Sequence, residues 1–125
     1  MNFKKNIEMV EIKGNLKQIK DKLGDDITLV AVSKTKPNED IMEAYETGHK
    51  DFGENKIQDM TDKYKALPKD IRWHMIGHVQ RNKVKYMVKY VHLIHAVDSL
   101  KLLKEINKRA KNEERTIQCL LQLKI

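Results

Sequence analysis

The sequence predicts an α/β fold of the (β/α)₈ barrel type, here an opening helix followed by roughly the first half of the barrel with about five parallel strands. Apolar, β-branched runs of strand length alternate with helical patterns along all 125 residues, and this alternation is typical of parallel βαβ units. The chain stops inside an apolar strand pattern, without a helix to cover it. Because a whole barrel takes about 250 residues, we expect residues 1–125 to be a single domain that forms half of one.

The opening segment predicts an amphipathic helix. Its apolar residues recur at roughly helical spacing between residues 7 and 23, and Gly24 follows as a stop signal. The run at 27–32 is nearly unbroken in its apolar, β-branched character, which favours a strand covered on both faces, as in a parallel sheet.

The same alternation continues to the end of the chain. Gly48 and Pro68 are stop signals after two helical patterns, and Asp98 or Ser99 is an N-cap before the last helix. The expected helices cover about 39–45, capped by Asn38, then 55–66, 80–88 and 99–110, and the expected strands cover 51–53, 71–76, 92–97 and 116–125.

Composition excludes several classes of protein. With 40% hydrophobic residues the chain can build a core, and no apolar run approaches the ~20 residues that a membrane helix needs, so we expect no membrane partner. The first residues lack the apolar stretch of a signal peptide, and Cys119 is the single cysteine. We therefore expect a cytoplasmic protein without an internal disulfide.

The positive charge is concentrated in one stretch. Residues 81–111 hold nine Lys or Arg and two acidic residues, while the rest of the chain is neutral overall. The stretch matches no helix-turn-helix or RNA-binding pattern, so we interpret it as a solvated helix surface and expect no nucleic-acid partner. A basic half-barrel that serves as an interaction module without a coenzyme stays an alternative.

Lys34 is the first candidate for chemistry, because reactive groups in (β/α) folds lie at the carboxyl ends of the strands. It directly follows the most apolar strand, where burial would favour a neutral amine able to attack a carbonyl carbon. The structural alternative is a lysine whose aliphatic stem reaches from the strand end into water.

Four motifs carry a resemblance to a known family. They are VSKTKP at 32–37, FGEN at 52–55, WHMIGHVQRNK at 73–83 and IHAVDS at 94–99. In order and spacing they resemble the YggS/PROSC family of pyridoxal-phosphate homeostasis proteins, from about residue 5 to residue 125. The resemblance implies an alanine-racemase-like fold that holds pyridoxal 5'-phosphate (PLP) as an internal aldimine on Lys34, without turnover. It also implies that Asn55 and His74 line the coenzyme.

Without the resemblance, Asn55 reads as a helix N-cap and His74 as a hydrogen-bonded core histidine. His74 and His78 lie four residues apart on a strand and a loop, where this spacing does not make side chains converge, so we expect no metal site. We also assign no catalytic residue. The alternative, a PLP-dependent racemase-type enzyme, needs a second acid/base group opposite Lys34, and the sequence supplies none.

The length of the chain limits the expected function. The family's phosphate-binding segment comes late in its chains and has no counterpart in these 125 residues, which contain no glycine-rich turn for a phosphate. We therefore expect PLP binding to be weakened or lost if the chain ends at Ile125. The unpaired edges of the strands at 27–32 and 116–123 also predict a homodimer.

Overall fold

The computed structural model describes the backbone of residues 3–125 and the side chains from residue 12 onward. It confirms the predicted alternation of helices and strands. The elements are α1 (Phe3–Leu23), β1 (Ala31–Val32), α2 (Asn38–Glu46), β2 (Asp51–Glu54), α3 (Ile57–Ala66), β3 (Arg72–Met75), the 3₁₀ helix η1 (Arg81–Tyr86), β4 (Leu93–Val97), α4 (Leu100–Asn112) and β5 (Gln118–Leu121).

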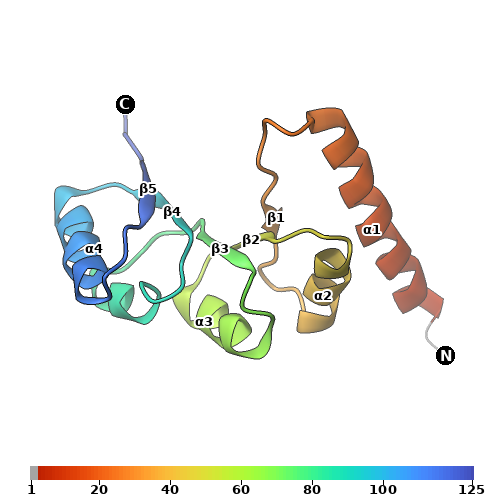
Figure 1. Cartoon of the computed structure of the whole chain (residues 1–125), viewed down its shortest axis with the longest axis horizontal. Helices are drawn as coiled ribbons and strands as arrows, with labels where there is room; N and C mark the ends of the chain where they lie inside the picture. The colour runs from red at the N-terminus through yellow and green to blue at the C-terminus, as the bar shows by residue number, and fades with distance from the viewer. Residues whose placement is uncertain (1–2) are drawn as a thin grey trace.

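The five strands form one sheet in which every neighbouring pair is parallel and the spatial order follows the chain order from β1 to β5. The sheet curves, and α2, α3 and α4 lie along its outer side (Figure 1). Consecutive parallel strands with helices outside them are the arrangement of a (β/α) barrel. The structure is thus a partial barrel of the alanine-racemase-like type, as the sequence predicted.

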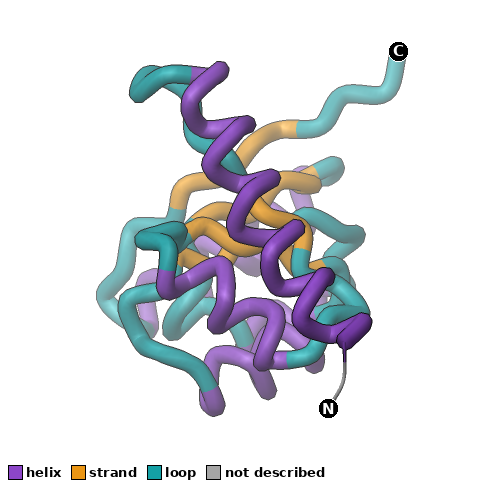
Figure 2. The backbone as a smooth tube through the Cα atoms, turned by 90° about the vertical axis from the view of Figure 1, so that its right-hand side faces the viewer, coloured by secondary structure: helices purple, strands orange, loops and turns teal. Residues whose placement is uncertain are grey.

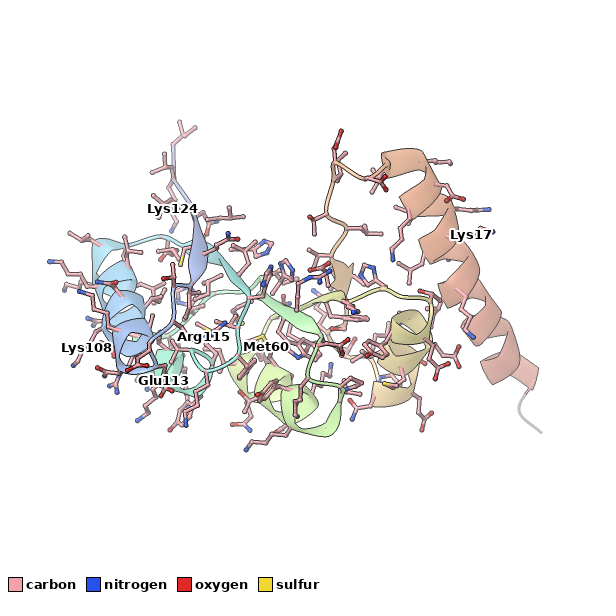
Figure 3. The ribbon with its side chains drawn as sticks, viewed as in Figure 1. Lys17, Met60, Lys108, Glu113, Arg115 and Lys124 are labelled. Carbon is pink, nitrogen blue, oxygen red and sulfur yellow. The ribbon has the colours of Figure 1, made fainter. Side chains whose placement is uncertain are left out.

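The hydrophobic core lies between the sheet and these outer helices. Phe52 of β2 and Trp73 of β3 lie opposite each other in register and are fully buried, as is Met75 two residues further along β3. Met60, labelled in Figure 3, contributes a fully buried side chain from α3. Alternate residues of each strand therefore pack against the helices, and the residues between them face the concave side of the sheet.

The helix α1 packs against α2 and crosses in front of the sheet in Figure 2. Leu16 is buried there, whereas Ile19 is 44% exposed; the side chain of Ile7 lies outside the described part. Gly24 ends the helix with a φ of 76°, a backbone conformation that glycine adopts without strain. Among the described residues, no helix combines the length and the apolar composition that a membrane span requires.

The first strand differs most from the sequence-based expectation. Only Ala31–Val32 pairs with β2, and both Ile27 (55% exposed) and Val32 (53%) face solvent rather than a covering layer. The physical reason is position: β1 is the edge of the sheet and has a paired neighbour on one side only. The strand that is buried at every position is β2.

Three other expectations about local structure are wrong. The expected helix at 80–88 is the 3₁₀ helix η1, held by bonds over three residues such as Met87 N–H to the Val84 carbonyl at 3.1 Å. The final strand is four residues long rather than ten. Asn38 is the first residue of α2 and not its cap, which is Pro37. By contrast, Ser99 caps α4 as expected, accepting a hydrogen bond from the Leu102 N–H at 3.1 Å.

Candidate functional site

The carboxyl ends of the strands bring the quoted motifs to one edge of the sheet. Lys34 follows β1 by two residues, Asn55 directly follows β2, and Gly77 follows β3 by two residues. Because the strands are parallel and ordered as in the chain, these residues lie at neighbouring strand ends. The sequence therefore correctly predicted which residues share this edge.

Lys34 lies in a tight turn between β1 and α2. Its side chain is exposed, and among the residues with described side chains no hydrogen bond or ion pair engages its ammonium. The next residue, Thr35, has a φ of 64°, and the Lys36 N–H donates to the Ser33 carbonyl at 3.1 Å, which closes the turn. The expectation that Lys34 is buried is wrong, because it follows the exposed edge strand of the sheet.

A buried polar network lies directly beneath this turn. Glu54, the last residue of β2, is 1% exposed, and its Oε2 atom lies 2.9 Å from the Nζ atom of Lys63 on α3. The Ser33 hydroxyl donates to the same Oε2 atom. A hydrogen bond between Ser33 and Glu54 thus joins the VSKTKP motif to the FGEN motif.

Glycine at position 77 lets two strand ends approach closely. A Cβ atom placed there would lie 2.4 Å from the backbone oxygen of Asn55, closer than two such atoms can approach. The chain after β3 therefore runs against the chain after β2. Asn55 does not cap α3, since the N-cap is Lys56 and no side chain makes the capping hydrogen bond.

Asn55 lines a pocket of about 470 Å³ between the start of α3 and the loop that precedes η1. His78, Lys56 and Lys83 also line it, so the pocket is basic, but Lys34 does not. The structure places Lys34 and Asn55 at adjacent strand ends without joining them in one pocket.

His74 lies on β3, with its ring between Asp51 of β2 and His95 of β4. It is 2% exposed; its Nε2 atom is 3.0 Å from Asp51 Oδ1, and its Nδ1 atom is 3.0 Å from His95 Nε2. Arg72 donates two hydrogen bonds to Asp51, at 2.9 and 2.7 Å. Burial raises the pKa of Asp51, but the hydrogen bonds from Arg72 and His74 outweigh it and hold this pKa at about 2.

One group in the described part has the composition of a metal site. Asp51, His74 and His92 each place a ligand atom within 4.8 Å of the other two, a grouping that sequence spacing did not indicate. His78, the histidine weighed with His74, lies elsewhere, with its Nδ1 atom 4.0 Å from an Asp98 oxygen. Since the Arg72 guanidinium already neutralises the Asp51 carboxylate, the cluster is balanced without a cation, and we assign it no metal.

Sequence reasoning missed Glu54 and Lys63 as possible site residues. Glu54 stands within the FGEN motif, so the motif itself was the available signal. Lys63 carries no such signal, because it lies on a helix whose pattern does not distinguish it from exposed neighbours such as Lys65.

The basic stretch contributes to the outer surface of α4. Lys101, Lys104 and Lys111 are exposed, and Lys108 points away from the body of the molecule (Figure 3). Arg115 at the end of this region turns inward instead and donates to the Val91 carbonyl at 2.9 Å. The exposed lysines fit the interpretation of a solvated helix surface.

The chain is similar to known proteins in both sequence and structure. The curated relatives include the pyridoxal phosphate homeostasis protein of Aquifex aeolicus, 49% identical over 83 residues that make up 66% of this chain and 36% of the relative. The pyridoxal phosphate homeostasis protein of Escherichia coli K12 is 33% identical over 131 aligned positions, which cover 94% of this chain and 56% of the relative. The chain thus spans about a third to a half of the length of these relatives.

Among solved structures, PipY of Synechococcus elongatus PCC7942 with PLP bound superposes with a TM-score of 0.85 at 35% identity. The match covers 91% of this chain and 55% of PipY. The family model of the alanine racemase N-terminal domain matches residues 7–125. The chain therefore belongs to the alanine racemase N-terminal domain family, and its similar proteins are the pyridoxal phosphate homeostasis proteins that the four motifs resemble.

Proposed function

We propose that this chain binds PLP covalently through Lys34, as a part of PLP homeostasis and without turnover. The supporting observation is the position of Lys34: its amine has no partner among the described residues, and it stands in a closed turn at the carboxyl edge of a fold shared with PLP-bound PipY. The coenzyme supplies an aldehyde, which condenses with a primary amine and releases water.

The described residues fit this role for the lysine and less well for the phosphate. Lys34 presents an accessible primary amine at a strand end, and a primary amine is the group with which an aldehyde condenses. A phosphate needs several backbone N–H donors, yet the two glycines with positive φ, Gly24 and Gly48, follow helices at the opposite end of the strands. We therefore propose that the 125-residue chain binds PLP more weakly than its longer relatives do.

The absence of turnover is also part of the proposal. A racemase needs a second proton-transfer group on the other face of the reacting carbon. Glu54 and Lys63, beneath the Lys34 turn, are hydrogen-bonded to each other and to Ser33, so we assign them to holding the turn and not to proton transfer. We propose a cytoplasmic protein, consistent with the single Cys119.

Asn55 and His74 stand differently in this proposal. Asn55 lies one strand away from Lys34 at the same edge, so we propose that it lines the coenzyme. His74 uses both ring nitrogens on Asp51 and His95, so we propose that it lines the concave face of the sheet and makes no hydrogen bond to PLP.

Borohydride reduction in the presence of PLP, followed by peptide mapping, tests the covalent role of Lys34. We expect the label on Lys34 to exceed that on Lys36 by at least about tenfold, and Lys34→Ala to lose the labelled peptide while Lys36→Ala keeps it. Lys36 is the internal comparison, because it is an exposed lysine of the same turn. A label spread evenly over the lysines, or one that survives Lys34→Ala at full strength, would refute the assignment.

A further inference from the structure

The ion pair beneath the Lys34 turn is unusual in its burial and its partners. Glu54 is 1% exposed and Lys63 13%, and the Nζ and Oε2 atoms lie 2.9 Å apart. The pair joins the end of β2 to the last turn of α3, two elements that are already held by the core through Met60 and Phe52. The sheet and helix therefore do not depend on it to meet.

Both members of the pair also bind Ser33, the residue before Lys34. Lys63 donates to the Ser33 carbonyl at 2.8 Å, and the Ser33 hydroxyl donates to Glu54 Oε2. The Ser33 N–H donates in addition to the Gly53 carbonyl at 2.9 Å. The backbone N–H, backbone carbonyl and side chain of Ser33 are thus all fixed from β2 and α3.

The energetics favour a positional effect over a stabilising one. Taking two charges out of water offsets much of their attraction, so a buried ion pair stabilises a fold little by itself. Here the second carboxylate oxygen of Glu54 is buried and accepts no hydrogen bond from the described residues, which adds a further cost. What the pair does achieve is to anchor β1, which has only two paired residues, immediately before Lys34.

We propose that Glu54 and Lys63 are positioning residues that hold the Ser33–Lys36 turn, so that the side chain of Lys34 projects from a fixed point on the carboxyl edge of the sheet. The importance of that amine rests on the proposed function, whereas the tethering of the turn does not. Lys63 acts through the Ser33 carbonyl, and Glu54 acts through the Ser33 hydroxyl and by orienting Lys63.

Hydrogen exchange of the purified 125-residue chain, without coenzyme, tests the tether directly. The readouts are the Ser33 and Lys36 amides, which bond to the Gly53 and Ser33 carbonyls. We expect Lys63→Met to speed their exchange on the order of tenfold, since a hydrogen bond from a charged donor is lost. Lys63→Arg, which keeps a cationic donor, should restore most of the protection. Lys65→Met makes the same chemical change at an exposed site of α3 and should leave both amides at the wild-type rate.

A labelling ratio then separates positioning from general loosening. With PLP and borohydride, we expect the Lys34 to Lys36 ratio to fall about tenfold toward one in Lys63→Met and Glu54→Gln, and to stay at the wild-type value in Lys65→Met. The comparison is internal, because both lysines belong to one turn. A folded Lys63→Met protein with wild-type exchange and a wild-type ratio would overturn the proposal.

Two further outcomes have defined meanings. If Lys63→Met does not fold, the double variant Glu54→Gln/Lys63→Met, which removes both charges together, is measured in its place. Faster amide exchange in the turn of the double variant supports the tether, and unchanged exchange refutes it. If wild-type protein labels all lysines evenly, the proposed function fails, while the exchange rates still report on the tether.

Discussion

The inner strands β2 and β3 are more buried than the outer strands β1 and β5, although only the two inner strands contain charged residues. All four residues of β2 are buried, and only Arg72 is exposed in β3. In β5, Leu120 and Leu121 are 49% and 68% exposed. The apolar character of a strand therefore does not determine its burial; its number of paired neighbours and covering layers does.

This difference bears on the candidate site, because Lys34 follows an outer strand while Asn55 follows an inner one. The inner strand holds Asn55 in place through the core and through the close approach of Gly77. The outer strand offers Lys34 no such support, and the Glu54–Lys63 pair supplies it instead. The molecule thus carries Lys34, the lysine of the proposed function, directly after an exposed edge strand.

The largest effect that we expect comes from a cavity in the core beside an inner strand. Met75→Ala in β3 removes a fully buried side chain and should lower the free energy of unfolding by about 2–5 kcal/mol. Leu121→Ala removes a similar volume from β5, where it is 68% exposed, and should cost about 0.5 kcal/mol or less. Urea denaturation of both variants measures the contrast. Equal losses would show that the outer strand is as well packed as the inner one.

A smaller effect concerns the charge at the amino end of β2. The pKa of Asp51 is about 2 in the folded protein, below its ordinary 3.8, so the ionised carboxylate stabilises the fold above about pH 4. That contribution disappears as the pH falls through the folded pKa. We expect the free energy of unfolding of wild type to exceed that of Asp51→Asn by on the order of 2 kcal/mol at pH 6 and by little at pH 2.

Unfolding free energies of the two proteins across this pH range check the prediction. The contributions of the other acidic groups are the same in both proteins and cancel in the difference. Glu105→Gln is the control, because Glu105 makes a partly exposed ion pair with Arg109 that solvent screens. A wild-type advantage over Asp51→Asn that persists unchanged at pH 2 would contradict the assigned role of Arg72 and His74.

The smallest effect on folding concerns the open edge of β5. Its unpaired backbone groups and the exposed Leu121 and Leu123 are a template for another strand, so we expect the 125-residue chain to self-associate. Leu121→Lys/Leu123→Lys should make it monomeric in sedimentation equilibrium, with stability changed by about 0.5 kcal/mol or less. Leu100→Lys, at an equally exposed leucine on α4, should leave the association intact. A wild-type chain that stays monomeric at every concentration would refute the edge contact.

Much of the fold was predictable because it depends on local signals. Gly24 and Gly48 end helices with positive φ, and Ser99 caps α4, each as its residue type favours. The strand patterns gave the number and order of the strands. The motifs also identified the strand ends at which Lys34 and Asn55 lie, because parallel strands present their carboxyl ends at one edge.

The sequence by itself determined the order of elements, the parallel sheet and the family resemblance, since these follow from periodicity, turn residues and motifs. Only the tertiary structure decided that the most apolar run is an exposed edge, that His74 faces Asp51 and His95, and that Lys63 reaches Ser33, 30 positions earlier in the chain. The physical reason is that burial and hydrogen-bond partners depend on which elements pack together in space, and a single strand or helix carries no record of its neighbours.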